Sequence, residues 1–189
     1  MEQSGKTVSD NALQLEWMEI QAAQVDRAAF RPLYDRYFEA VFRYIYRRTG
    51  DKSLADDLCS QVFLKAMQRL DKYTFKGVPF SAWLYRIAGN EIAQHFRNSS
   101  RDRVVSVEDD ALNYLADEVE EDDLGALREV LIQSLELIRE QDLEIIELRY
   151  FEGRPFKEIA EILEITESNA KIRTYRVLER LKKHILQKK

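Results

Sequence analysis

The side chains best suited to chemistry in this chain recur at helical spacing near its carboxyl end. Apolar residues at helical spacing through 167–186 leave a polar face on the opposite side of that segment. Cations bind DNA phosphates, and amide, hydroxyl and guanidinium groups read base edges in the major groove. This face therefore predicts contact with duplex DNA. Its members are Ser168, Asn169, Lys171, Arg173, Arg176 and Arg180.

The segment just before this face completes a helix-turn-helix pattern. Residues 155–163 form a short helical segment with Ile159, Ala160 and Leu163 on its packing face, and the small Ala160 allows close crossing. In the next segment, the inner positions are Ala170, Thr174, Val177, Leu178 and Leu181.

The turn between these two segments makes two further predictions. Thr166 is the expected N-cap, and a helix N-terminus also favours phosphate. Glu164 occupies a position where Gly is usual, so it either adopts a left-handed backbone or the turn differs. The alternative is a plain helical hairpin with a solvated basic face.

A second mixed face is predicted on a helix from Phe80 to Phe96. Aromatic rings interleaved with cations suit single-stranded nucleic acid, because rings stack on unpaired bases while cations follow phosphates. Taken alone, these residues fit somewhat better with an aromatic core and solvated arginines. The helix carries Trp83, Arg86, Asn90, Gln94 and Arg97, and the loop 71–79 before it adds Lys72, Tyr73, Phe75 and Lys76.

The helix predicted to open at Ser53 has an unusual outer face. Ser53 and Asp56 resemble a capping box with Asp in place of Glu. Farther along, Asp57, Gln61 and Leu64 align on the side opposite the apolar stripe. An exposed Leu among polar residues is compatible with a protein-binding surface, although a single exposed Leu is ordinary.

Residues for catalysis are not evident in the sequence. We find no Gly-rich phosphate loop, nucleophile elbow or metal-ligand spacing, and therefore expect no enzyme, cofactor or metal. The single Cys59 lies on an apolar stripe and fits a reducing cytoplasm. The first residues have no signal-peptide core, and no apolar run is long enough to insert into a membrane.

These faces must be positioned by helices, because apolar residues recur with helical period through most of the chain. Six Gly and three Pro argue further against an all-β fold. We therefore predict an all-α protein of two small helical domains joined by a flexible acidic linker, the second domain containing the helix-turn-helix. The predicted helices span 13–23, 30–49, 53–70, 80–96, 127–138, 142–151, 155–163 and 167–186.

The distribution of charge supports this division. Residues 1–101 hold 15 basic and 12 acidic residues, a net of +3, and residues 154–189 hold 10 and 5, a net of +5. Between them, residues 102–153 hold 4 basic and 17 acidic residues, a net of −13. The total of −5 therefore conceals two basic blocks. Composition alone favours a passive, solubilising role for the segment 98–126.

Taken together, these segments resemble the extracytoplasmic-function (ECF) group of bacterial RNA polymerase sigma factors. AAFRPLYDRYFEAVFRYIYRRTGDKSLADDLCSQVFLKAMQRLDKY followed by PFSAWLYRIAGNEIAQHFR is similar to sigma region two. DLEIIELRYFEGRPFKEIAEILEITESNAKIRTYRVLERLKK is similar to sigma region four. The resemblance implies a region-two-like domain at 1–97, a linker at 98–126 and a region-four-like domain at 127–189.

The resemblance also implies partners and a role for each face. Such proteins bind core RNA polymerase, through the clamp helices of its largest subunit and the flap, and direct it to promoter DNA. Core binding would fall to Asp56, Asp57, Gln61 and Leu64. Strand opening at the minus-ten element would fall to Lys72, Tyr73, Phe75, Lys76, Trp83, Arg86, Asn90 and Arg97. Reading of the minus-thirty-five element would fall to Thr166, Ser168, Asn169, Lys171, Arg173, Arg176 and Arg180.

The resemblance further implies an anti-sigma partner, and a linker that contacts polymerase. The main alternative is a stand-alone helix-turn-helix regulator with an N-terminal dimerisation or sensing domain. That alternative explains the C-terminal face but neither of the N-terminal ones. A small enzyme acting on nucleic acid is disfavoured by the missing metal and acid–base residues.

Overall fold

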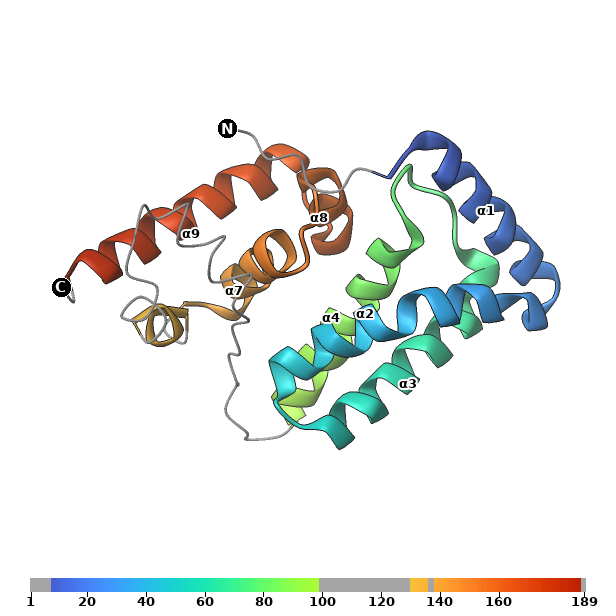
Figure 1. Cartoon of the computed structure of the whole chain (residues 1–189), viewed down its shortest axis with the longest axis horizontal. Helices are drawn as coiled ribbons and strands as arrows, with labels where there is room; N and C mark the ends of the chain where they lie inside the picture. The colour runs from blue at the N-terminus through green and yellow to red at the C-terminus, as the bar shows by residue number, and fades with distance from the viewer. Residues whose placement is uncertain (1–7, 99–129, 136–137, 188–189) are drawn as a thin grey trace. The chain divides into compact units, whose positions relative to one another are not determined.

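The computed structural model describes residues 8–98, 130–135 and 138–187 (Figure 1). All regular secondary structure in these ranges is helical, which confirms the predicted all-α fold. The chain divides into two compact units, one built on Thr7–Arg103 and the other mainly on Val104–Ala160 and Glu164–Lys189. Apart from residue 98, the predicted acidic linker 98–126 lies outside the described residues, as does the start of the predicted helix 127–138.

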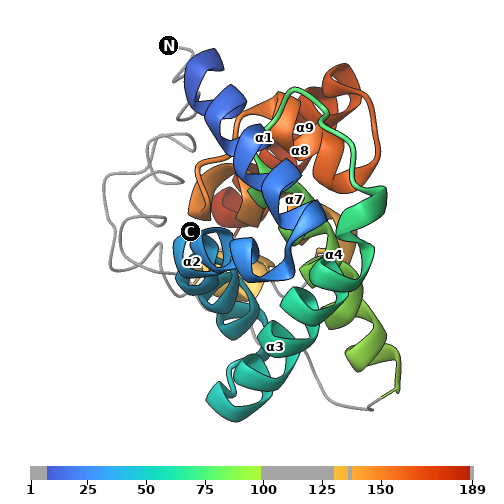
Figure 2. The same cartoon turned by 90° about the vertical axis from the view of Figure 1, so that its right-hand side faces the viewer.

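The N-terminal unit is a helical bundle in which α2, α3 and α4 pack against one another (Figure 2). Leu33, Val41 and Ile45 of α2 are buried, as are Val62 and Ala66 of α3. In α4, Phe80, Leu84, Ala88 and Ile92 recur at helical spacing and are buried, while Phe96 is half-buried near the helix end. The described α-helices of this unit are α1 (Asp10–Val25), α2 (Arg31–Thr49), α3 (Lys52–Arg69) and α4 (Phe80–Asn98), with 3-10 turns at Arg27–Phe30 and Leu70–Lys72.

The junction between α2 and α3 differs from the sequence prediction. Gly50 ends α2 in the left-handed conformation, with φ of 64°, and donates its amide to the Tyr46 carbonyl. Asp51 then adopts an extended backbone, and its carboxylate accepts the Leu54 amide at 3.1 Å. The predicted capping box at Ser53 and Asp56 is therefore wrong. Because the Asp51 side chain accepts an amide of the first turn that has no partner within the helix, the helix begins at Lys52, one residue before Ser53.

Helix α1 holds the loop before α4 at both ends. The buried Glu16 carboxylate accepts the Phe80 amide at 2.7 Å, and so caps the N-terminus of α4. The same carboxylate accepts the Tyr37 hydroxyl of α2. At the other end of the loop, the Gln24 side-chain amide donates to the Leu70 carbonyl at 2.8 Å and to the Tyr73 carbonyl at 3.0 Å. Three helices and the loop are thus joined through polar side chains of α1.

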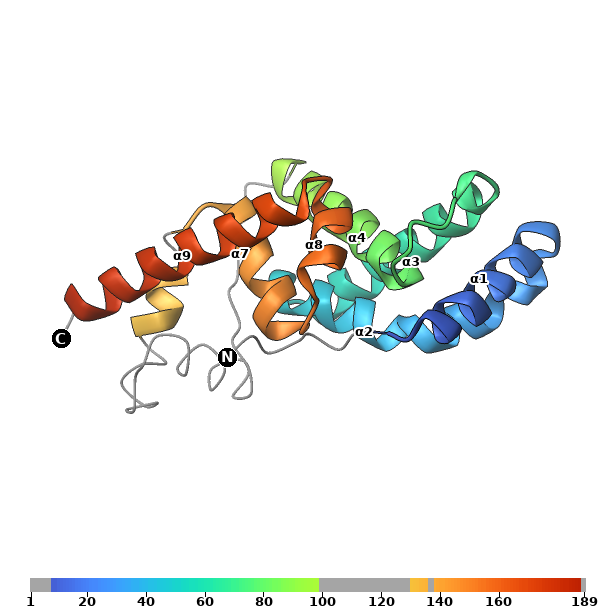
Figure 3. The same cartoon turned by 90° about the horizontal axis from the view of Figure 1, so that it is seen from above.

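The C-terminal unit consists of short helices packed on one long helix (Figure 3). Residues 130–135 are helical, and α7 (Glu140–Ile146) continues into a π-helical turn at Glu147–Phe151. Next come α8 (Phe156–Leu163) and α9 (Glu167–Gln187). The buried residues of this unit include Leu131, Leu135, Leu143, Ile146, Ile159, Val177 and Leu181.

Two features are absent from the described ranges. The helices of these ranges do not include one that is both long and apolar enough to cross a membrane. In the same part of the chain, no three His, Cys, Asp or Glu side chains are grouped as a metal ion would need.

Replacing Glu16 tests whether α1 stabilises the N-terminal unit through this cap. Glu16→Ala removes a charged acceptor and leaves the Phe80 amide and the Tyr37 hydroxyl without it, so we expect a loss of about 2–4 kcal/mol in the free energy of unfolding. Urea denaturation measures this loss. The control is Glu19→Ala, since the Glu19 side chain is 37% exposed and pairs with Arg36 at the surface. That variant should lose less than about 1 kcal/mol, and equal losses in both variants would contradict the proposed role of the cap.

Candidate nucleic-acid interface

The turn between α8 and α9 is built around a strained residue and a capping residue. Glu164 adopts the left-handed conformation, with φ of 55° and ψ of 42°. Among the described non-Gly residues it alone has a positive φ. The Ile165 amide donates to the Ala160 carbonyl at 3.0 Å, which closes α8. Thr166 then caps α9, as predicted, because its hydroxyl accepts the Asn169 amide at 3.2 Å.

The inner face of α9 is buried as the apolar spacing predicted. Ala170, Thr174, Val177 and Leu181 are all 0% exposed, and the Thr174 hydroxyl donates to the Ala170 carbonyl at 2.9 Å. In α8 the prediction is partly wrong, since Leu163 is only half-buried. The other two predicted positions, Ile159 and Ala160, are buried.

The outer face of α9 is polar and cationic, with two apolar side chains that the sequence analysis missed. Ile172 is 49% exposed and Tyr175 is 45% exposed. A signal for them was present in the sequence, because both stand beside the cations at helical spacing and so share their face. Apolar side chains in the major groove contact thymine methyl groups, so they suit a DNA-reading face. The predicted residues that are exposed are Thr166, Ser168, Asn169, Lys171, Arg176 and Arg180.

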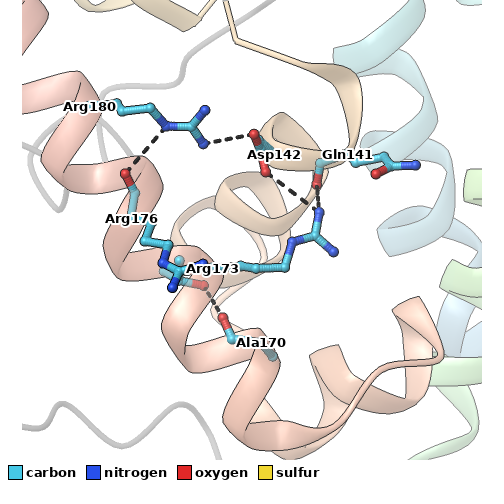
Figure 4. Close-up of polar contacts among 7 residues, drawn as sticks. Gln141, Asp142, Ala170, Arg173, Arg176 and Arg180 are labelled. Carbon is cyan, nitrogen blue, oxygen red and sulfur yellow. Dashed lines mark hydrogen bonds and ion pairs between the residues drawn. The ribbon is translucent and has the colours of Figure 1, made fainter.

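Arg173 and Arg180 are held by an acid on a neighbouring helix (Figure 4). Asp142, in the first turn of α7, lies 2.7 Å from Nη2 of Arg180 and 3.6 Å from Nη2 of Arg173. Arg173 also donates to the Gln141 carbonyl at 3.3 Å, and Arg180 to the Arg176 carbonyl at 3.4 Å. Sequence spacing gave no sign of this group, because Asp142 and Arg180 are brought together only by packing of α7 on α9.

The second predicted site, on α4 and the loop before it, contains an aromatic cluster. The Trp83 ring lies 4.8 Å from the Tyr73 ring and 5.4 Å from Phe80, and Phe75 stacks on Trp17 at 5.9 Å. Tyr73 is only 8% exposed, and burial raises the pKa of its hydroxyl. Trp17 of α1 was not foreseen, because it lies far from the loop in sequence. Trp83, Phe75 and Arg86 are half-buried, whereas Lys72, Lys76, Asn90 and Arg97 are exposed.

The third predicted site is the outer face of α3. Asp56, Asp57 and Gln61 are exposed, and Leu64 is 55% exposed. Cys59 lies on the opposite side of the same helix, 0% exposed, and burial raises the pKa of its thiol to about 12. Cys59 is therefore a core residue, and Leu64 is an apolar side chain presented to solvent.

Comparison with known proteins identifies the two units. Sigma-70 region 2 matches residues 33–102, and sigma-70 region 4 matches residues 128–181. BldN, an ECF RNA polymerase sigma factor of Streptomyces coelicolor, is 36% identical over 179 residues, which are 92% of this chain and 66% of BldN. SigD of Mycobacterium tuberculosis, another ECF sigma factor, is 30% identical over 88% of this chain and 81% of its own length.

A solved structure supports the fold. CnrH, in complex with the cytosolic domain of CnrY, has a TM-score of 0.61 at 21% identity and covers 88% of this chain and 94% of CnrH. The chain belongs to the extracytoplasmic-function group of RNA polymerase sigma factors.

The left-handed residue in the α8–α9 turn can be tested by substitution. Glu164→Gly relieves the backbone strain, so we expect the free energy of unfolding to rise by about 0.5–1 kcal/mol, measured by urea denaturation. The matched control is Glu167→Gly, which places Gly inside the first turn of α9 and should lower stability by about 1 kcal/mol. A loss of stability with Glu164→Gly would contradict the assignment of strain.

Proposed function

We propose that this protein binds core RNA polymerase and directs it to promoters, with α9 reading the upstream element and α4 opening the strands downstream. The observation that carries the proposal is the pair of polar, cationic faces, one on each unit, within segments that match sigma-70 regions 2 and 4 in that order. The chain spans 66% of BldN, so the activity is inferred from the parts that are shared.

The α9 face supports recognition of duplex DNA. Asn169 and Arg176 are exposed and can hydrogen-bond to base edges, while Lys171 is placed for phosphate. Thr166 caps the helix, and residues 166–169 at its N-terminus are exposed. We therefore assign the reading of the minus-thirty-five element to the polar face of α9 between Thr166 and Arg180.

The loop 71–79 and the exposed face of α4 support capture of an opened strand. Tyr73 is too buried to stack on a base, so we assign it to the floor beneath Trp83. Trp83 and Phe75 are half-buried and can present a ring edge or face to an unstacked base. Lys72 and Lys76 in the loop, and Asn90 and Arg97 farther along α4, are exposed and add groups for phosphates and base edges.

The outer face of α3 is the proposed docking surface for core polymerase. Leu64 supplies an apolar contact, and the exposed Asp56, Asp57 and Gln61, one to two turns before it on α3, supply polar contacts. Holding both DNA-reading units on one polymerase raises the effective concentration of each, so that two weak modules together select a promoter.

Three further assignments belong to this proposal. The domain boundaries are 1–97, 98–126 and 127–189, and the linker contacts polymerase. CnrH was solved with a protein partner, the cytosolic domain of CnrY, and we infer that a comparable anti-sigma partner covers this chain. The protein acts in the cytoplasm, without turnover of its own and without a cofactor.

The docking surface on α3 can be tested by reversing its polarity. Leu64→Arg should weaken binding to core RNA polymerase by about ten-fold or more, since it places a charge in the centre of an apolar contact. Fluorescence titration of the labelled full chain with core polymerase measures the affinity. The matched control is Leu15→Arg on α1, because Leu15 is 57% exposed and Leu64 55%. Equal weakening by both variants would contradict the assignment to α3.

One substitution in each unit tests whether α9 reads the upstream element and α4 opens the strands. Run-off transcription with core polymerase on a promoter library should show that Arg176→Ala loses preference in the upstream element alone, by about five-fold or more. Asn90→Ala should leave that preference intact and reduce strand opening, measured by permanganate reactivity of unpaired thymines. Both side chains are exposed, so neither variant should unfold the protein. A stand-alone regulator would instead bind the upstream element tightly without polymerase.

A further inference from the structure

One acid holds two of the cations on the proposed DNA-reading helix. Arg173 and Arg180 are seven residues apart, so they lie on one side of α9 about two turns from each other. Asp142 of α7 sits between them, and its two oxygens are shared, Oδ1 toward Arg173 at 3.6 Å and Oδ2 toward Arg180 at 2.7 Å (Figure 4). The Asp142 side chain is 14% exposed, which makes it the least accessible member of the group.

These contacts fix the arginines without using all of their donors. Each guanidinium has five N–H donors. The contacts with Asp142, Gln141 and the Arg176 carbonyl engage one nitrogen of Arg173 and two of Arg180. The side chains remain 25% and 48% exposed, respectively, so each still presents guanidinium to solvent. A long, flexible side chain that is already ordered loses less entropy when it binds a base edge.

The same contacts reduce the attraction of α9 for DNA of any sequence. Asp142 contributes one negative charge beside two positive ones, so the local charge falls from +2 to +1. Because binding to DNA of any sequence depends on neutralising phosphates, this lowers non-specific affinity and its dependence on salt. Orientation and partial neutralisation both favour specific over non-specific binding.

We propose that Asp142 is a positioning residue for promoter recognition, which pre-aligns Arg173 and Arg180 for base edges and lowers the binding of α9 to DNA of any sequence. This inference rests on the proposed function of α9 as the helix that reads the upstream element. It assigns to α7, which carries no predicted DNA contact, a share in sequence specificity.

Asp142→Asn tests the inference, because the amide keeps the shape of the side chain and removes its charge. Run-off transcription by the full chain with core polymerase, on promoters randomised in the upstream element, should show about a five-fold or greater loss of base preference at one or two positions. Binding of the full chain to poly(dA–dT) duplex should at the same time become tighter and steeper in salt, by about one unit of slope.

Two controls separate this role from others. Glu140→Gln removes one negative charge from the same turn of α7 and should leave the base preference within two-fold of wild type. Arg173→Lys keeps a positive charge and removes the planar fork, so it should lose the same base preference as Asp142→Asn. In the double variant, the loss should be no greater than in either single variant, because both changes disable one recognition unit.

Several results would overturn the inference. It fails if Asp142→Asn keeps the wild-type base preference, or if Glu140→Gln alters the preference equally. It also fails if Asp142→Asn lowers the base preference, the affinity for poly(dA–dT) and the midpoint of thermal unfolding together. Asp142 would then only stabilise the packing of α7 on α9. If Asp142→Asn does not fold, an undiminished base preference in Arg173→Lys overturns it. A wild-type protein without any upstream preference would instead refute the proposed function of α9, and the inference with it.

Discussion

The Glu16 carboxylate is a buried negative charge that α1 places against the first amide of α4. A helix N-terminus has orphan amides and a partial positive charge, and a buried carboxylate requires donors, so each group satisfies the other. The Tyr37 hydroxyl adds α2 to the same acid, and burial, reinforced by the Glu16 charge, raises the pKa of that hydroxyl. The position of the loop 71–79, and with it the proposed strand-capturing face, depends on this cap and on Gln24 at the loop's other end.

The C-terminal unit uses an acid in a related way. There Asp142 comes from a neighbouring helix and engages the side chains of α9 rather than its backbone. In both units, a carboxylate on a helix with no predicted nucleic-acid contact orders the helix that carries the proposed contacts. Glu16 and Asp142 therefore have a structural role, because each orders a helix that carries one of the proposed contact faces.

Some features were predictable because they follow from local spacing. The apolar stripes of α2, α3, α4 and α9, the stop at Gly50 and the cap at Thr166 each depend on residues within a few turns of one another. Glu164 was recognised as unusual, and the structure shows that it takes the left-handed conformation. The capping box at Ser53 failed because two start signals compete within three residues, and only the backbone after Gly50 decides in favour of Asp51.

The candidate sites were predictable in part, for the same reason. Helical period identified which residues share an outer face, and the match to sigma-70 regions 2 and 4 agrees with the family recognised from those segments. The helical periodicity of the apolar residues could not show that Tyr73 is buried, that Phe75 stacks on Trp17, or that Asp142 binds two arginines. Those contacts join residues distant in the chain, and their partners are chosen by how helices pack.

The sequence by itself therefore determined most of the described helices, the inward face of each long one, and the family, because side chains three or four residues apart on a helix meet regardless of what lies beyond it. Only the tertiary structure decided which residues of each outer face are exposed. It also decided that Arg173 and Arg180 form ion pairs with Asp142. Helix packing brings α1 to the loop 71–79 and α7 to α9, and no local pattern encodes a distance between segments so far apart.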